Sequence, residues 1–462
     1  MSVEPFLGGA GLCPAEPQRG PGASEAKEGA RGGTMGSPTL GQVLQASIFA
    51  ERRQTPRPGP RPRLLVLNQY YWPGIEATAH LLTELCEGLA DEYDETVQTT
   101  GVNGAARPGR SRRNGVTIVR LASTTFERRR LSLRALNYVT YVVRAVGAGA
   151  ASGRPDIVLC MTDPPFLGDA ALLVARRFRV PLVVITQDVF PEIAVELGRL
   201  ENRILVDLLR RAVRSYLQRA DRIVAIGETM RRRLEEKGAE PARVTVIPNW
   251  VDTTVLRPQA RDNAWARANG LVERFVVMHS GNVGHAQDLE SLVRAATFLR
   301  DLERLSIVVI GIGARHAELV ALAARLETDR VLFLPYQPRE SLSESLSSAD
   351  VHVVGLASGL AGFVVPSRMY GVLAVGRPVI VAADADSETA LVAREGGCGL
   401  VVPPGRPELL AEAIRDAYEG RHDLAAMGAR ARRYAVAETD RRVAVGRYRE
   451  LLGEVRAARP PH

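Results

Sequence analysis

The sequence predicts an α/β fold of two doubly wound, mostly parallel sheets. Short runs that are apolar throughout alternate with segments of helical periodicity, which is typical of strands buried on both faces of a parallel sheet. This alternation occurs twice, once before and once after residues 244–258. A chain of 462 residues is also long enough for two or three domains.

The N-terminal part divides into a leader and a first domain. Residues 1–62 are rich in Gly, Pro, Ala, Glu and Arg without a sustained period, which predicts a disordered leader. We expect the first domain to span residues 63–248. Leu81, Leu82, Leu85 and Leu89 mark the apolar face of its first helix. Buried strands are expected at residues 64–68, 96–100, 116–121, 156–161, 182–188 and 222–226.

The second domain repeats this pattern over residues 249–437. Its strands are expected at residues 275–278, 306–311, 331–335, 351–355 and 378–382. Residues 438–462 are expected to form a final helix with a short tail. Because ligands of open parallel sheets bind at the carboxyl ends of the strands, two such domains facing each other predict a cleft between them.

Bulk properties restrict the class of protein. Hydrophobic content of 46% and charged content of 24% are ordinary for a soluble globular protein. The net charge of +8 fits nucleic acid, acidic lipid or phosphate-bearing partners, or simply an arginine-rich composition. Aromatic content of 5% argues against a nucleic-acid platform, in which bases stack on aromatic rings. We therefore expect no nucleic-acid partner.

The cysteines and apolar runs indicate a cytoplasmic protein. Cys13, Cys86, Cys160 and Cys398 are scattered, with no metal-ligand spacing, which predicts reduced thiols, with Cys160 and Cys398 buried. No apolar run reaches the length of a membrane span, and no secretory signal follows the N-terminus.

A glycine-containing loop organises the second domain. Residues 276–278 form an apolar run, a loop with Gly281 and Gly284 follows, and helical periodicity begins after Asp288, which occupies an N-cap position. Backbone N–H groups and a positive helix end then meet at one point, which favours a phosphate. The alternative is a plain strand-to-helix turn.

Four segments in this order resemble the family 4 glycosyltransferases of the GT-B fold. They are VIPNWVD (246–252), SGNVGHAQDLESLV (280–293), ADVHVVG with PSRMYGVLAVGRPVIVA (349–355 and 366–382), and the stretch that begins SETALVAREGG (387–397). Two further segments, NQYYWPGIEATAHLLTEL (68–85) and TQDVFPEIAVELG (186–198), are similar to the branch that contains fucosamine and colanic-acid type transferases of bacterial surface polysaccharides.

The resemblance implies a reaction and an arrangement. It implies retaining transfer of a sugar from a nucleotide-sugar, with UDP as the expected nucleotide, and neither a cofactor nor a bound metal. It places an acceptor glycan, free or lipid-linked, in the first domain and the donor in the second, with the last helix crossing back to the first. Two rivals stay open: a nucleotide-sugar epimerase of the same fold, and a catalytically inactive binding partner.

The resemblance also assigns donor-site residues, with departures from the family pattern. The family's Glu-x7-Glu pair falls at Gly371 and at Gly359 or Phe363, and its phosphate-binding Arg and Lys become Asn282 and Gln287. Arg368 is the best cation for the departing diphosphate, and Arg315 is a weaker one, or a solvated helix residue. The donor-site residues are Gly281, Asn282, Gly284, His285, Gln287, Gly311, Arg315, Pro366, Ser367, Arg368, Gly371 and Glu388.

Asp188 and Glu192 are the catalytic candidates of the first domain. Asp188 matches the Asp of the branch's Asp-x-x-Pro-Glu motif and could orient the acceptor hydroxyl or take its proton. The alternative is an N-cap for the next helix. Tyr71, Trp72 and Gly74 are assigned to the acceptor loop, with core packing of the aromatic rings as the alternative.

Two further motifs have both a functional and a structural interpretation. Residues 384–386 imitate the metal-binding DxD of another transferase fold, but Ser387 and Glu388 are expected to cap the next helix instead, so no metal site is assigned. Residues 126–147 join an arginine cluster to an apolar helix. That segment fits either a packed helix or peripheral contact with anionic lipid at the inner face of the plasma membrane.

Overall fold

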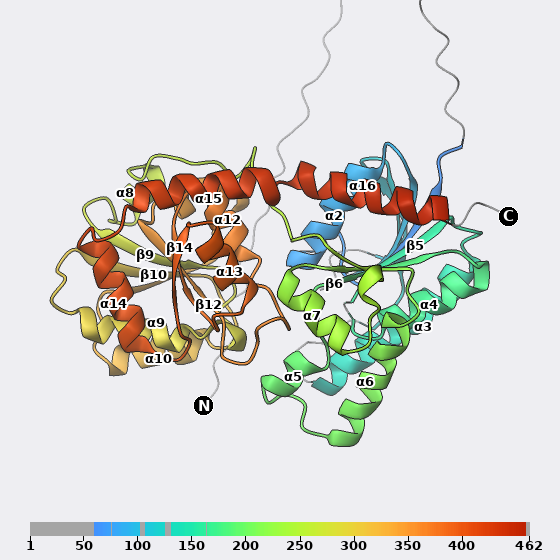
Figure 1. The fold of residues 1–462 in the computed structure, drawn as a ribbon, viewed down its shortest axis with the longest axis horizontal. Helices are drawn as coiled ribbons and strands as arrows, with labels where there is room; N and C mark the ends of the chain where they lie inside the picture. The colour runs from blue at the N-terminus through green and yellow to red at the C-terminus, as the bar shows by residue number, and fades with distance from the viewer. Residues whose placement is uncertain (1–59, 75, 102–106, 125–130, 163, 459–462) are drawn as a thin grey trace, which may run out of the picture. The chain divides into compact units, whose positions relative to one another are not determined.

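The computed structural model describes residues 60–458 apart from 75, 102–106, 125–130 and 163. Most of the expected leader, residues 1–62, therefore lies outside the described residues. Residues 60–462 form one compact unit, which contains two parallel sheets with helices on both faces (Figure 1). The prediction of a doubly wound α/β architecture is confirmed.

The first sheet has eight strands in the order β3-β4-β2-β1-β5-β6-β7-β8, parallel except for the pair β3–β4. Its strands are β1 (Arg63–Leu67), β2 (Asp94–Thr100), β3 (Gly109–Arg113), β4 (Val116–Leu121), β5 (Ile157–Met161), β6 (Leu182–Thr186), β7 (Arg222–Ala225) and β8 (Val244–Val246). Its helices are α2 (Ala77–Leu89), α3 (Leu131–Ala151), α4 (Leu167–Phe178), α5 (Glu192–Glu196), α6 (Arg203–Leu217) and α7 (Glu228–Glu236).

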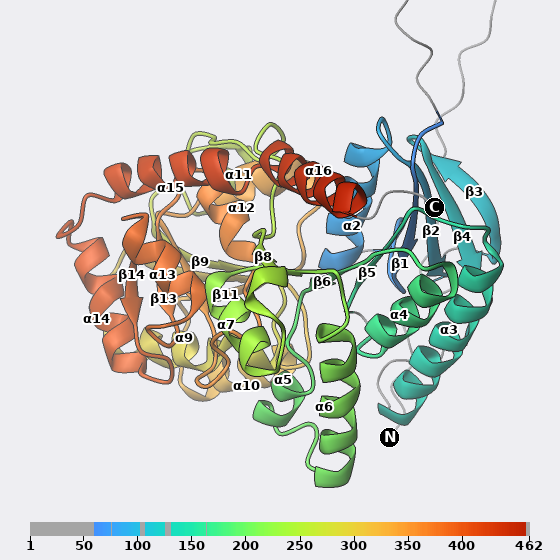
Figure 2. The ribbon, with the colours of Figure 1, turned by 45° about the vertical axis from the view of Figure 1, so that its right-hand side comes forward.

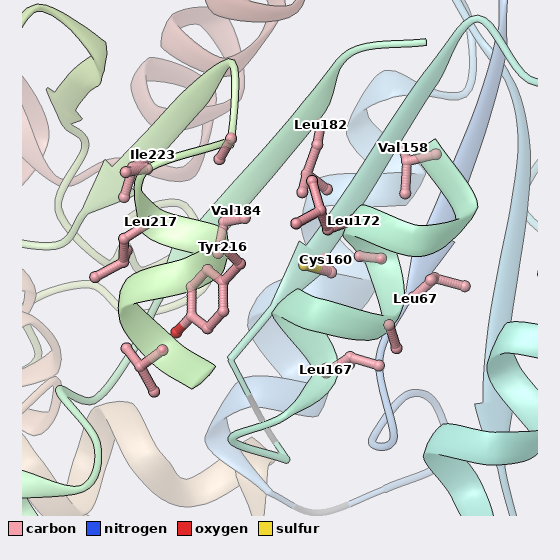
Figure 3. Packing of buried hydrophobic residues seen from close by; sticks show 14 of the residues in the cluster. Leu67, Val158, Cys160, Leu167, Leu172, Leu182, Val184, Tyr216, Leu217 and Ile223 are labelled. Carbon is pink, nitrogen blue, oxygen red and sulfur yellow. The ribbon is translucent and has the colours of Figure 1, made fainter. Parts of the chain in front are cut away.

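Alternate residues of the central strands enter two different cores. Val158, Cys160 and Val184 face a cluster filled by α3, α4, α6 and α7, whereas Leu159 and Ile185 face a cluster filled by α2 and α16 (Arg441–Ala458). Figure 3 shows the first of these clusters, with Tyr216 of α6 and Leu172 of α4 against the strands. The strands read as continuous apolar runs because both of their faces are covered.

The second sheet has six parallel strands in the order β11-β10-β9-β12-β13-β14. Its strands are β9 (Phe275–Ser280), β10 (Leu305–Ile310), β11 (Val331–Leu334), β12 (Val351–Gly355), β13 (Val379–Ala382) and β14 (Gly399–Val402). Its helices are α8 (Ala264–Ala268), α9 (Leu289–Ala295), α10 (His316–Arg325), α11 (Leu342–Ser347), α12 (Arg368–Ala374), α13 (Glu388–Glu395), α14 (Pro407–Tyr418) and α15 (Leu424–Glu438).

Short 3-10 turns and the last helix complete the unit. The turns are η1 (Pro241–Arg243), η2 (His285–Gln287), η3 (Ala296–Leu299) and η4 (Arg339–Ser341). Helix α16 packs against α2, and its Tyr448 meets Trp250 edge to face, with ring centroids 5.8 Å apart. The C-terminal helix thus contributes to the core of the first sheet, on the face of that sheet opposite α3, α4 and α6.

Three strands were not predicted, and strand β6 was predicted two residues too long. Strand β3 has the sequence GRSRR and contains no apolar residue, because it is an exposed edge strand. Strands β8 and β14 are short edge strands of their sheets. Strand β6 ends at Thr186 rather than at Asp188, since Asp188 pairs outside its own sheet.

Candidate functional site

The site of the second sheet forms where the strand order reverses. From β9 the chain proceeds to β10 on one side, and from β12 it proceeds to β13 on the other, while β9 and β12 are neighbours. The loops after these two strands meet, because the Ala357 N–H donates to the Ala286 carbonyl at 2.8 Å. This reversal point is the usual ligand site of an open parallel sheet.

Gly281, after β9, and Gly311, after β10, allow the backbones of these two loops to come close together. The N–H of Gly281 donates to the Ile310 carbonyl at 2.9 Å, and both Gly281 (φ +142°) and Gly311 (φ +130°) have left-handed backbone torsions. A Cβ atom on Gly311 would lie 1.9 Å from the carbonyl oxygen of Gly281. Glycine is therefore required at Gly311 by both torsion and space.

We expect Gly311→Ala to lower the free energy of unfolding by about 1–3 kcal/mol. Gly371→Ala is the matched control, because a Cβ on Gly371 would meet only Leu256 and Leu346, at 3.7 and 3.8 Å. In helix α12 that control should be neutral or stabilising by about 0.5–1 kcal/mol. Urea unfolding measures both variants, and equal midpoints would show that the Gly281–Gly311 contact carries no strain.

Arg368 points into the glycine loop without a carboxylate partner. Its Nη1 donates to His279 Nε2 at 2.6 Å and to the Asn282 carbonyl at 3.3 Å. Among the described residues it forms no ion pair. Burial lowers the pKa of Arg368 to about 10, so the guanidinium remains charged at neutral pH. A crowded cation whose protein partners are neutral is a strong candidate to meet an anionic ligand.

His279 is a site residue that the sequence reasoning missed. It is fully buried in β9, and burial followed by the Arg368 charge lowers its pKa well below the usual range. A neutral ring can accept at Nε2, so His279 can hold Arg368 without competing for an anion. The available signal was a histidine within an otherwise apolar strand.

The polar residues of the loop are used mainly inside it. The Gly284 N–H donates to Oε1 of Gln287 at 2.9 Å, so that both groups stabilise the turn. Asp288 occupies the N-cap position of α9 but makes no side-chain cap bond there; its carboxylate accepts from Ser291 and from the Gly405 N–H. His285 is exposed, and burial together with the Arg199 and Arg315 charges lowers its pKa.

Arg315 is neutralised by carboxylates. Its guanidinium contacts Glu290 at 2.9 Å and also pairs with Glu318, and these contacts raise its pKa. These pairings favour a structural role in the start of α10 over contact with phosphate. By contrast, no carboxylate among the described residues pairs with Arg368.

The start of α12 lies beside the loop. Pro366 is buried, and the Met369 N–H donates to its carbonyl at 3.2 Å. Ser367 occupies the N-cap position without a side-chain cap bond. Gly371 lies one turn further on, where a side chain would meet only ordinary contacts. Packing therefore does not explain the glycine in place of the family's Glu.

Asp188 lies next to the second domain. It forms a β-bridge with Val364, and the Val189 N–H donates to the Phe363 carbonyl at 2.8 Å. The residue has an exposed surface, but protein atoms packed around its carboxylate desolvate it and raise its pKa to about 6. The carboxylate has no partner among the described residues. The N-cap alternative is wrong, because α5 starts at Glu192 with Pro191 at its N-cap.

Glu192 is held by two cations. It pairs with Lys237 and, at 3.2 Å, with Arg210, and Lys237 also donates to the Phe190 carbonyl at 3.0 Å. These contacts anchor the segment that follows Asp188. They favour a positioning role for Glu192 over acid–base work.

The loop after β1 lies at the reversal point of the first sheet, between β1 and β5. Trp72 is 39% exposed; the Arg113 guanidinium lies 4.5 Å from its ring centroid, and Arg120 donates to its carbonyl at 3.0 Å. Tyr71 is buried in the core, which favours the packing alternative. A Cβ on Gly74 would lie 2.9 Å from the Tyr71 carbonyl oxygen, so the turn requires glycine.

Glu388, the first residue of α13, makes a contact between the second domain and α7 of the first domain. Its Oε2 accepts from the backbone N–H and the hydroxyl of Thr229, both at 3.1 Å, and burial raises its pKa. Ser387 caps α13 through the Ala390 N–H, as predicted, whereas the Glu388 side chain contacts Thr229 instead of capping this helix. Asp384 accepts from the Gly359 N–H at 2.8 Å, so this residue of the DxD-like motif serves a turn.

Two remaining expectations concern thiols and membranes. Cys86, Cys160 and Cys398 are buried free thiols, which confirms the prediction for Cys160 and Cys398. Residues 126–130 of the arginine-rich segment lie outside the described residues. Within residues 60–458, apart from the gaps given above, no helix has the length and apolar character that crossing a membrane requires.

Comparison with known proteins identifies the family. Residues 76–250 match the family model of the glycosyl transferase 4-like domain, and residues 262–434 match that of the glycosyl transferases group 1. The chain is 29% identical to the probable glycosyltransferase WbjE of Pseudomonas aeruginosa, over 60% of this chain and 68% of that protein. It is 28% identical to the putative colanic acid biosynthesis glycosyl transferase WcaI of Escherichia coli K12, over 57% of this chain and 66% of that protein.

Solved structures give the same fold. The crystal structure of Anabaena HepE in complex with UDP superposes with a TM-score of 0.67 at 15% identity, over 85% of this chain and all of that one. The structure of WaaG, a glycosyltransferase involved in lipopolysaccharide biosynthesis, gives a TM-score of 0.63 at 16% identity, over 84% of this chain and 99% of that one. The chain therefore belongs to the GT-B glycosyltransferases, in the group that resembles surface-polysaccharide enzymes.

Proposed function

We propose that this protein is a retaining glycosyltransferase that moves a sugar from a UDP-sugar to an acceptor in bacterial surface polysaccharide or glycoconjugate assembly. The donor would bind at the loop of Gly281 and Gly311, and the acceptor would approach from the first domain. The relatives named for polysaccharide synthesis and the UDP complex of a structural neighbour support this choice of substrate class. No metal takes part in the proposed reaction.

The observation that carries the proposal is Arg368. It is a crowded guanidinium at the reversal point of a parallel sheet, held by a neutral imidazole and a carbonyl rather than by a carboxylate. A donor diphosphate brings the missing negative charge. Asn282 and Gly281 lie beside the guanidinium and complete a site that an anion can fill.

The proposed chemistry follows from these positions. The bond between the sugar C1 and the phosphate oxygen breaks, and its electron pair leaves with the nucleoside diphosphate. Arg368 stabilises that charge. The acceptor oxygen forms the new bond to C1 on the same face, and its proton passes to the departing phosphate or to a carboxylate.

Asp188 is the proposed carboxylate. With a pKa of about 6 it is mostly ionised at neutral pH and can orient the acceptor hydroxyl and receive its proton. Its bridge to Val364 brings it beside Phe363, one of the two positions where the family's first Glu would fall. We propose that Asp188 supplies, from the first domain, a carboxylate in place of the family's first Glu.

The experiment that tests the proposal is a thermal-shift screen of the full chain with UDP, GDP, dTDP, ADP and NAD, in the presence of EDTA. A ligand at a hundredfold excess over its Kd should stabilise the folded state by about 2.7 kcal/mol. We expect UDP to raise the midpoint, followed by turnover of UDP-sugars. If no nucleoside diphosphate shifts the midpoint, the inactive-partner alternative replaces this proposal.

A further inference from the structure

Helices α3, α4 and α6 form one layer on a single face of the first sheet. Helix α4 packs against both α3 and α6, and buried residues of all three fill the same core cluster (Figure 2). Their outer sides belong to the surface of the described unit. Two properties of that outer surface, its apolar residues and its charge, are unusual for a solvated helix layer.

The first property is exposed apolar area. Fifteen large apolar side chains are exposed among the described residues, and seven of them lie on these three helices. Leu136, Val139 and Val143 follow each other at helical spacing on the outer side of α3, and Val143 is 64% exposed. On α6, Ile204 is 83% exposed and Leu208 60%. Exposed apolar side chains gathered on one layer of helices indicate an interaction surface, whereas single exposed apolar side chains do not.

The second property is charge. On helices α3, α4 and α6, seven arginines are exposed among the side chains that the structure describes, and the same helices contain two acidic residues, Asp169 and Asp207. These seven arginines exceed the two acidic residues by five positive charges, a large share of the net charge of +8 of the whole chain. Arg144, Arg176 and Arg211 are exposed beside the apolar side chains.

Exposed apolar side chains together with an excess of arginine restrict the kind of partner that this surface can bind. Seven exposed arginines on each of two facing copies would repel one another, which argues against a symmetric dimer through this surface. Exposed Leu, Ile and Val side chains offer nothing to a nucleic-acid backbone. An anionic lipid surface satisfies both properties at once, because phosphate headgroups meet the arginines while the apolar side chains enter the acyl boundary.

We propose that the outer surface of α3, α4 and α6 docks this protein on an anionic lipid bilayer. Each helix leads directly into β5, β6 or β7, so its first turns lie at the carboxyl edge of the sheet, where Asp188 follows β6. Ile204, Leu208 and Leu136 lie in the first turns of α6 and in the first half of α3, toward that edge. The docked edge would therefore face a lipid-linked acceptor. This last point rests on the proposed function, whereas docking itself does not.

Vesicle flotation tests the proposal with the full chain and no substrate. We expect the protein to float with vesicles of phosphatidylcholine and phosphatidylglycerol and not with phosphatidylcholine alone. The variant Arg144→Gln/Arg176→Gln/Arg211→Gln should lose roughly a hundredfold in partitioning, at about fivefold for each arginine. Ile204→Gln/Leu208→Gln should also lose binding, and added salt should weaken the wild type.

The matched control is Val320→Gln/Arg325→Gln on α10, which removes an exposed apolar residue and an exposed arginine from the second domain. It should float like the wild type. The proposal is overturned if the wild type fails to float, if the arginine variant floats unchanged, or if the protein dimerises through this surface without lipid. A protein that floats but transfers no sugar would instead count against the proposed function.

Discussion

Replacing Asp188 by asparagine is expected to lower kcat by about 100- to 10,000-fold, the usual contribution of a positioned acid–base group. Asparagine keeps the size of the side chain and can still touch an acceptor hydroxyl, but it cannot accept a proton. Nucleotide affinity should change little, because the contacts of Asp188 to the second domain run through the backbone. Steady-state turnover of a UDP-sugar, with KM and kcat separated, measures the effect.

The control for this substitution is Glu192→Gln. Glu192 follows in the same segment but is paired with Lys237 and Arg210, so its removal should lower stability more than kcat. Asp188→Asn should leave the melting midpoint unchanged or raise it. If Asp188→Asn turns over at the wild-type rate, Asp188 is not the carboxylate of the reaction.

The sign of the stability effect follows from the raised pKa. A native pKa of about 6 exceeds the usual value of an unfolded aspartate, so the native state binds more protons between these two values. Stability therefore falls as pH rises from about 4 to 6 and stays reduced above that range. Asparagine at position 188 cannot ionise, so the variant avoids this loss of stability at neutral pH. In the wild type, kcat should fall about tenfold for each pH unit below about 6.

Replacing Arg368 by glutamine is expected to weaken binding of UDP by about 10- to 100-fold, which corresponds to the loss of about 1.5–3 kcal/mol from charge-assisted hydrogen bonds. Lysine at this position should recover part of the affinity, since it keeps the charge but not the planar fork. Isothermal titration with UDP measures both variants.

Arg315→Gln is the matched control, because Arg315 also begins a helix beside the loop but is already paired with Glu290 and Glu318. It should reduce stability and leave UDP affinity within about threefold. Equal losses of affinity in the two variants would contradict the assignment of the diphosphate to Arg368.

The fold could be predicted from the sequence because both faces of each sheet are covered. Strands such as β5 and β9 are then uninterrupted apolar runs, and the helices between them show their buried stripe. The edge strand β3 could not be found in this way, since its residues are polar and charged. Strand β3 is recognisable only from its antiparallel pairing with β4 in the folded structure.

The site could be predicted only in part. Gly281 and Gly311 were recognisable because left-handed torsion and close backbone approach require glycine. The sequence could not show that carboxylates neutralise Arg315 and that cations hold Glu192. Nor could it show that, within the part of the chain that the structure describes, no charged partner pairs with Arg368 or Asp188. Whether a charged side chain remains available to bind a ligand depends on partners that are distant in sequence, such as His279 of β9 for Arg368.

The neutral imidazole of His279 gives the proposed donor site the same charge over a wide range of pH. Its pKa lies well below the usual range and that of Arg368 is about 10, so neither group changes protonation between mildly acidic and mildly basic solution. The phosphates of a nucleotide-sugar also keep their charge over this interval. At mildly acidic pH the proposed donor site would then still bind its nucleotide-sugar while transfer through Asp188 slows, so the protein would hold its donor without turning it over.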